Sequence, residues 1–446
     1  MSFPISEASP VRFAATLPPR ADVVVVGGGV IGVMTAWFLR ERGLSVVVCE
    51  KGRIAGEQSG RNWGWVRQQG RDPGELPIMV ESLSIWKRLA AEMGDGLGFR
   101  QTGVLYLAKT EREIEGFEAW TEHARAHQLD TRLLTAAETM AMLKGAAAPW
   151  KGGLFTASDA RAEPWVAVPA LAAAAAEKGV VIRESCAVRG LDLAAGRVAG
   201  VVTEAGRVAC DQVVVAAGAW SRLFLGQHGI CIPQLSVLAS VAATEPMPEI
   251  FPGNAADDDF AFRRRADGGY SIAPGARHDF FIGRDSFASF GVYLPVLKKD
   301  FRSTNFRLAA PKGFPDAWGT PRRWALDVTS PFERQRILNP APNMATLAET
   351  QDSFARAFPS LGRPRLKTAW AGMIDSLPDV VPIVDRAPIP GLIIATGMSG
   401  HGFGIGPGMG RVIADMVAGR PSGHDMSRFR LSRFSDGSPI RPGPSL

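Results

Sequence analysis

The feature that most restricts the fold of this chain is the run Gly27-Gly28-Gly29-Val30-Ile31-Gly32, which satisfies the pattern G-x-G-x-x-G. Residues 22–26 before it are almost all valine, as in a parallel strand buried on both faces. Residues 33–42 after it have apolar side chains at helical spacing, and residues 45–49 form a second apolar run that ends at Glu50. The sequence therefore predicts a strand–helix–strand unit with a glycine-rich turn.

Each residue of this turn has a role in holding a dinucleotide. Gly27 allows the tight turn, Gly29 lets the backbone approach a pyrophosphate, and Gly32 lets helix and strand pack closely. The start of the helix, at Val30-Ile31, offers unpaired N–H groups to the pyrophosphate. Glu50 is placed to accept hydrogen bonds from ribose hydroxyls, and it disfavours a 2′-phosphate. The motif predicts a dinucleotide site, and by itself it fits FAD or NAD.

Composition excludes several classes of protein. The chain has 446 residues, of which 46% are hydrophobic and 21% charged, enough for two or three domains. Collagen-like, disordered and disulfide-framework proteins do not have this composition. The net charge of +6 comes from 50 basic and 44 acidic residues dispersed along the chain. It indicates a mild attraction for anions and no nucleic-acid partner.

The cysteines and the apolar pattern predict the compartment. Cys49, Cys186, Cys210 and Cys231 stand far apart, with no C-x-x-C and no paired His spacing, so we expect free thiols and no metal site. Residues 1–20 contain four prolines and no apolar run. No stretch reaches the ~20 apolar residues that a membrane-spanning helix needs. We therefore expect a cytoplasmic protein without a membrane span.

Beyond Glu50 the sequence resembles a known group of flavoproteins. Residues 51–62, with the sequence KGRIAGEQSGRN, resemble the loop that wraps FAD in D-amino acid oxidase, glycine oxidase, sarcosine oxidase and D-amino acid dehydrogenase. Residues 212–221 are similar to the second FAD segment of that superfamily, and residues 396–403 match its T-G-x-S-G-H-G-F motif. Locally, residues 42–59, 221–224 and 330–333 look most like bacterial L-amino acid deaminase. The resemblance covers residues 22–418.

The resemblance implies an α/β fold: a Rossmann-like FAD-binding domain with a discontinuous α+β substrate domain, as in D-amino acid oxidase. We expect an N-terminal extension (1–20), an FAD-binding domain (21–76, 150–232 and 365–420), a substrate-binding domain (77–149 and 233–364) and a loose C-terminal tail (421–446). Residues 78–93 and 111–127 have helical patterns, and residues 233–364 have a strand pattern. Residues 260–273 predict a hairpin that turns at Asp267-Gly268-Gly269.

The resemblance also implies which residues contact FAD. Besides the glycine-rich turn and Glu50, these are Lys51, Gln58, Ser59, Arg61, Asn62, Trp63, Val188, Ala217, Gly218, Trp220, Gly372, Gly397, Gly400, His401, Gly402, Phe403 and Gly404. In the last loop, uncovered backbone amides and the dipole of the following helix would stabilise negative charge at the N1–C2=O edge of the flavin.

Three residues are candidates for catalysis. An arginine fork binds a carboxylate through two parallel contacts, which points to the run Arg263-Arg264-Arg265. Arg263 resembles the carboxylate-binding arginine of L-amino acid deaminases, and Arg265 is the better match to glycine oxidase; the alternative is a solvated basic strand edge. His401 could be a catalytic base or a structural contact to the flavin or a neighbouring carbonyl.

The leading hypothesis is an FAD-dependent oxidoreductase, a flavoprotein of the amino acid oxidase, dehydrogenase or deaminase type. It would oxidise the C–N bond of an α-amino acid, or an N-substituted one, by hydride transfer to flavin N5, and water would hydrolyse the imine to a 2-oxo acid. The electron acceptor would be oxygen, a quinone or another carrier. One alternative is the flavin subunit of a hetero-oligomeric amine or opine dehydrogenase that is inactive without its partner. A second alternative is an NAD-linked enzyme with the same fold.

Overall fold

The first of two large sheets contains the predicted strand–helix–strand unit. The structure, a computed structural model, describes residues 3–300, 303–441 and 443. Six strands lie in the order β21-β22-β13-β1-β2-β9. Their bounds are β1 (Val23–Val26), β2 (Val46–Cys49), β9 (Val181–Arg183), β13 (Gln212–Val215), β21 (Ile383–Arg386) and β22 (Leu392–Thr396). All pairs are parallel except β21 with β22. The predicted pair of parallel strands is confirmed.

Both faces of this sheet are covered, which explains why β1 is valine throughout. One face packs on four helices, α1 (Val30–Glu41), α3 (Leu76–Met93), α6 (Pro164–Glu177) and α12 (Gly402–Val417). The other face packs on α7 (Ser221–Gln227) and on a small sheet of β10 (Val188–Ala194), β11 (Arg197–Thr203) and β12 (Gly206–Ala209). Helix α1 begins three residues before the expected 33–42, so Val30 and Ile31 form its first turn.

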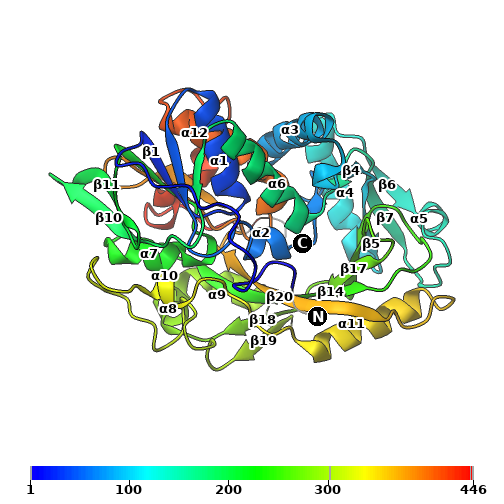
Figure 1. Ribbon diagram of the computed structural model, residues 1–446. Coiled ribbons are helices and arrows are strands. Elements are labelled where there is room, and N and C mark those ends of the chain that lie inside the picture. Colours follow the sequence, from blue (N-terminus) through cyan, green and yellow to red (C-terminus); the bar gives the residue numbers. More distant parts are fainter. Residues whose placement is uncertain (1–2, 301–302, 442, 444–446) are drawn as a thin grey trace.

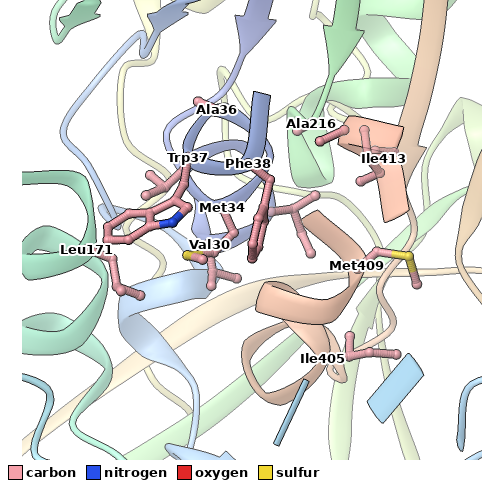
Figure 2. Packing of buried hydrophobic residues seen from close by; sticks show 14 of the residues in the cluster. Val30, Met34, Ala36, Trp37, Phe38, Leu171, Ala216, Ile405, Met409 and Ile413 are labelled. Carbon is pink, nitrogen blue, oxygen red and sulfur yellow. The ribbon is translucent and has the colours of Figure 1, made fainter. Parts of the chain in front are cut away.

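Helices α1 and α12 pack unusually closely. Figure 2 shows α1, with Met34 and Phe38, beside α12, with Ile405, Met409 and Ile413; all five residues belong to one apolar cluster. A β-carbon on Gly410 would lie 2.6 Å from the backbone carbonyl carbon of Met34, so this contact requires a residue without a side chain. The C-terminal helix is therefore held against the helix that follows the glycine-rich turn.

The second sheet has ten strands and lies below the first in Figure 1. Nine run in the order β19-β18-β14-β17-β16-β15-β5-β7-β6, and β20 pairs with β14. Their bounds are β5 (Val104–Ala108), β6 (Thr131–Thr135), β7 (Gly152–Thr156), β14 (Leu235–Thr244), β15 (Asn254–Ala256), β16 (Phe260–Arg264), β17 (Tyr270–Pro274), β18 (His278–Phe281), β19 (Thr304–Arg307) and β20 (Leu366–Ser376). The hairpin of β16 and β17 is confirmed, with Arg264 opposite Tyr270.

Helices cover the two faces of the second sheet. Helix α11 (Met344–Ala357) packs its Phe354 on the aromatic side chains of β16 and β17, and α4 (Glu111–Ala126) lies on the opposite face. The helices α3 and α4 confirm the patterns at 78–93 and 111–127. Residues 152–156 and 366–376, which the sequence placed in the FAD-binding part, contribute β7 and β20 to this second sheet.

Shorter elements join the two sheets. A three-stranded sheet of β3 (Trp65–Val66), β8 (Ala160–Arg161) and β4 (Arg100–Gln101) lies between them. The remaining helices are α2 (Gln58–Arg61), α5 (Ala136–Met142), α8 (Arg284–Ala288), α9 (Phe290–Asp300) and α10 (Pro331–Arg334), with the 3₁₀ turns η1 (Gly94–Leu97), η2 (Gly218–Trp220), η3 (Ser427–Phe429) and η4 (Leu431–Phe434). Within the described residues, no helix is long and apolar enough to cross a bilayer.

The C-terminal segment is not the loose tail that its polar composition predicts. Phe429 is fully buried, and the buried Arg433 forms an ion pair of 2.7 Å with Asp379. Because Asp379 lies 54 residues earlier in the chain, composition alone gives no sign of this docking.

Candidate active site

A cavity of about 860 Å³ runs from the first sheet to the second. One end is lined by the glycine-rich turn, the loop after β2 and the end of β13, and the other by β14, α4 and the loop 65–71. The predicted cofactor residues that line it are Gly27, Gly29, Val30, Ile31, Glu50, Lys51, Gln58, Ser59, Arg61, Asn62, Trp63, Val188, Ala217, Gly218, Trp220, Gly372, Gly400, His401, Gly402 and Phe403. The structure thus brings together segments that are far apart in the sequence.

Three predicted cofactor residues, Gly32, Gly397 and Gly404, are not exposed to the cavity but pack behind the residues that line it. Gly32 packs against the turn, because a β-carbon there would lie 2.0 Å from the carbonyl oxygen of Gly27. Gly397 donates its N–H to the Asp375 carboxylate. Gly404 lies inside α12, where its carbonyl accepts hydrogen bonds from Ser82 and Trp86.

The glycine-rich turn has the geometry of a dinucleotide site. Gly27 has φ of +114°, and a β-carbon on it would lie 2.4 Å from the carbonyl oxygen of Ala216. Glu50 is held at the end of β2 by the N–H groups of Gly28 and Gly52, each 2.7 Å from a carboxylate oxygen. Burial raises the pKa of Glu50. The carboxylate is thus oriented before any ribose reaches it.

Among the described residues, the cavity wall contains buried polar atoms without a hydrogen-bond partner. These are Arg61 Nη2, Trp65 Nε1, Asp375 Oδ1 and Arg71 Nη1, the last of which lies 3.6 Å from Oε2 of Glu75. A buried polar atom without a partner is costly, so such atoms indicate a polar ligand. Together with the glycine cradle and Glu50, they fit FAD, whose two halves carry hydrogen-bonding groups along their length.

The strand order sets the direction of that ligand. Strand β2, which ends at Glu50, lies on one side of β1, and strands β13 and β22 lie on the other. A dinucleotide crosses the carboxyl ends of such strands with its adenosine half on the side of the acidic residue. Its other half would therefore lie over the ends of β13 and β22.

His401 is held by buried charges. It is the N-cap of α12, and its Nδ1 lies 3.2 Å from Oε2 of the fully buried Glu75. Arg71 donates from Nη2 to the His401 carbonyl at 3.1 Å. Burial lowers the pKa of His401; burial alone would raise the pKa of Glu75, but His401 and Arg71 lower it. The bond to Glu75 favours the structural alternative for His401.

The two predicted carboxylate-binding arginines lie outside the cavity. Arg263 is 1% exposed and forms a bidentate ion pair with Glu163, at 2.8 and 3.0 Å. Arg265 pairs with Asp267 at 2.8 Å and lies 5.0 Å from the ring centre of Trp165. Both guanidinium groups are thus paired with acidic residues of the protein.

A different arginine lines the cavity. Arg67, in the loop 65–71, is 8% exposed and lies 5.9 Å from the ring centre of Tyr106. It donates to the carbonyl of Gln69, and among the described residues no carboxylate pairs with it. Aromatic side chains surround this end of the cavity: Trp63, Trp65, Tyr106, Phe117 and Trp120. Its position five residues after the expected FAD loop (51–62) could have marked Arg67 as a candidate site residue.

Known proteins resemble this chain over nearly its whole length. Residues 22–416 match the family described as FAD dependent oxidoreductase. The solved L-amino acid deaminase from Proteus myxofaciens, in complex with anthranilate, is 32% identical, covering 96% of this chain and 98% of that one with a TM-score of 0.89. The sarcosine oxidase subunit beta of Rhizobium meliloti (strain 1021) is 25% identical over 94% of this chain and 89% of its own length. These matches confirm the expected fold class.

Proposed function

The chain belongs to the family of FAD-dependent oxidoreductases, and on that premise we propose that it oxidises the C–N bond of an α-amino acid with a large apolar side chain. The product is an imine that water hydrolyses to a 2-oxo acid. The observation that carries this proposal is the aromatic end of the cavity, which has a guanidinium in its wall and is continuous with the cofactor end.

Arg67 is the group that we assign to the substrate carboxylate. Its guanidinium is buried and forms no direct ion pair among the described residues, although it acts electrostatically on the buried carboxyl groups of Asp159 and Glu75. Arg263 and Arg265, by contrast, are directly paired. A planar guanidinium fixes the orientation of a carboxylate as well as neutralising its charge. The aromatic residues around Arg67 would contact the substrate side chain and exclude water. L-amino acid deaminase from Proteus myxofaciens was solved with anthranilate, an aromatic carboxylate, which supports this arrangement.

The cofactor supplies the chemistry, and the protein supplies orientation and charge. Bound FAD would supply the redox chemistry, as the acceptor of a hydride from the substrate carbon that bears the nitrogen. A carboxylate held by Arg67 would fix the orientation of the substrate in the cavity, where Ala239 of β14 and Gly372 of β20 line the wall without bulky side chains. The N-terminus of α12, at residues 402–403, faces the same space, and its dipole stabilises negative charge there.

The assignment is tested by replacing Arg67. We expect Arg67→Met to raise KM about 10- to 100-fold, because a lost hydrogen bond to a charged group costs ~1.5–3 kcal/mol. The FAD content should be unchanged. Steady-state kinetics on a panel of D-, L- and N-alkyl amino acids, preceded by anaerobic flavin bleaching to find the substrate, would measure this.

Arg277 provides a matched control. It also lines the cavity, but its side chain is 56% exposed at the rim and pairs with Glu349. We expect Arg277→Met to change KM less than twofold. A large KM increase for this variant and none for Arg67→Met would contradict the assignment. The rate at which air reoxidises the bleached protein would distinguish oxygen from a quinone or another carrier as the electron acceptor.

A second candidate function is the flavin subunit of a hetero-oligomeric enzyme. The match to a sarcosine oxidase subunit beta favours it, as does a group of exposed apolar side chains, namely Phe287, Phe290, Leu308 and Trp318. This candidate predicts bound FAD that no amino acid bleaches until a partner chain is added. Bleaching of the isolated chain would exclude it.

A further inference from the structure

The carboxyl group of Asp375 is buried in the cavity wall with one oxygen unused. The residue is 1% exposed and lies near the end of β20. Its Oδ2 accepts a hydrogen bond of 2.8 Å from the N–H of Gly397 and lies 3.3 Å from the hydroxyl of Thr396. Within the part of the chain that the structure describes, its Oδ1 has no hydrogen-bond partner. Burial raises the pKa of Asp375 to about 6, although the Gln58 side chain and the Met398 backbone act in the opposite direction. Among the described residues, no basic side chain forms an ion pair with it.

Strand geometry points this carboxyl group toward the ends of the strands of the first sheet. Side chains alternate along a strand, so Gly372 and Ile374 share a face of β20 and Asp375 points to the other. On that other side lie Gln58, whose Oε1 accepts from the backbone N–H of Asp375, and Gly397 at the end of β22. Both are predicted FAD contacts. Asp375 thus faces the ends of the strands of the first sheet.

The part of FAD that reaches these strand ends has hydroxyl donors. With the adenosine half on the side of Glu50, the half over β13 and β22 would contain the ribityl chain and the flavin ring. A buried carboxylate oxygen requires a donor, and the ribityl chain between pyrophosphate and ring has three hydroxyl groups. We propose that Asp375 is a cofactor-binding residue that accepts a hydrogen bond from a ribityl hydroxyl of FAD through Oδ1.

This role goes beyond the proposed reaction, because it concerns FAD alone and does not depend on the substrate. It also differs from a purely structural role. Asp375 braces the loop 397–401, since its carbonyl accepts the N–H of Ser399 and its side chain accepts the N–H of Gly397. A brace would affect the binding of every flavin nucleotide equally, whereas a bond to one hydroxyl would not.

The test compares FAD with analogues that lack one hydroxyl. Apoprotein would be titrated with FAD and with its 2′-, 3′- and 4′-deoxyribityl analogues, and dissociation constants would be measured by flavin fluorescence. We expect the unmodified protein to bind one analogue about 10- to 100-fold more weakly than FAD. We expect Asp375→Ala to bind FAD more weakly by a similar factor and to lose the discrimination against that same analogue.

Two further variants make the outcome decisive. Gln234→Met removes side-chain bonds to Gly218 and Thr396, which hold the same loops from outside the cavity, and should keep the discrimination. Asp375→Asn keeps the size of the side chain and one acceptor oxygen, and it replaces Asp375→Ala in the test if that variant does not fold. It should discriminate between FAD and the analogue less strongly than the unmodified protein does. Equal weakening for FAD and all analogues in both Asp375 variants would overturn the proposal, as would an unmodified protein that does not discriminate. Selective loss with an N3-methyl flavin analogue instead would assign the bond to the ring.

Discussion

At the scale of single residues, Arg263 could bind a substrate carboxylate or form a structural ion pair, and the sequence could not distinguish these roles. The buried pair of Arg263 and Glu163 shows the second. Arg263 has the residue type and strand position of a carboxylate clamp, but Glu163 already occupies both of its outer nitrogens. The partner lies 100 residues away in the chain. The residues around Arg263 in the sequence therefore give no indication of this ion pair. A buried ion pair of this kind is costly to break from one side, because the remaining charge is left without a partner.

The structure therefore predicts that Arg263 stabilises the folded protein and does not bind substrate. We expect Arg263→Met to lower the free energy of unfolding by about 3–5 kcal/mol and to leave KM unchanged. Urea unfolding and steady-state kinetics would measure the two effects. The double variant Arg263→Met with Glu163→Gln removes both charges and should recover part of the loss. If Arg263→Met raised KM and left the free energy of unfolding unchanged, Arg263 would be the residue that binds the substrate carboxylate.

The cofactor residues were the more predictable part of the site. Gly27, Gly29 and Glu50 follow from a motif whose members are close in sequence and whose geometry is local. The sequence did not predict the roles that we propose for Arg67 and Asp375, because each depends on which distant segments meet. Tyr106 beside Arg67 and Thr396 beside Asp375 come from other parts of the chain.

At the scale of elements, the glycines of α12 set the distance between helices. Gly410 contacts the backbone of α1, and a β-carbon on Gly408 would lie 2.5 Å from the carbonyl oxygen of Ile78 in α3. Because backbone atoms cannot move aside as a side chain can, α12 must shift if either glycine is replaced. The helix that faces the cavity with its N-terminus is therefore positioned by two close contacts.

We expect Gly410→Ala to lower the free energy of unfolding by about 1–3 kcal/mol, the usual cost of overpacking. The matched control is Gly116→Ala in α4, where an added β-carbon meets nothing within 4 Å. That change should raise stability by about 0.5–1 kcal/mol, because alanine is the better helix former. Thermal or urea unfolding would compare them. Equal effects of the two substitutions would show that the α1–α12 contact can relax.

Local elements were predicted well, and their partners were not. The strand–helix–strand unit, α3, α4 and the β16–β17 hairpin follow from periodicity and turn residues. The pairing of β20 with β14 was missed, although it joins the longest strands of the second sheet. These strands begin at Leu235 and Leu366, and a strand pattern does not identify a partner at such a separation.

At the scale of the whole molecule, FAD should behave as part of the core. The cavity runs between the two sheets, so a bound cofactor contacts both. We expect FAD at 100 times its dissociation constant to stabilise the protein by about 2.7 kcal/mol. Unfolding should remain a single transition, and its midpoint temperature should rise. Calorimetry of the apoprotein with increasing FAD would measure this. Two transitions, of which only one responds to FAD, would contradict a cofactor that joins the sheets.

Strand β20 has a consequence for how variants of this enzyme should be analysed. Its Gly372 and Ile374 line the cavity on one side, while Asp375 next to them secures the loop at the start of α12. On the two proposals above, one continuous backbone carries contacts to both substrate and cofactor. Substitutions along it will shift substrate affinity and cofactor retention in concert, so a change in turnover there cannot be apportioned until occupancy by flavin has been quantified for each variant.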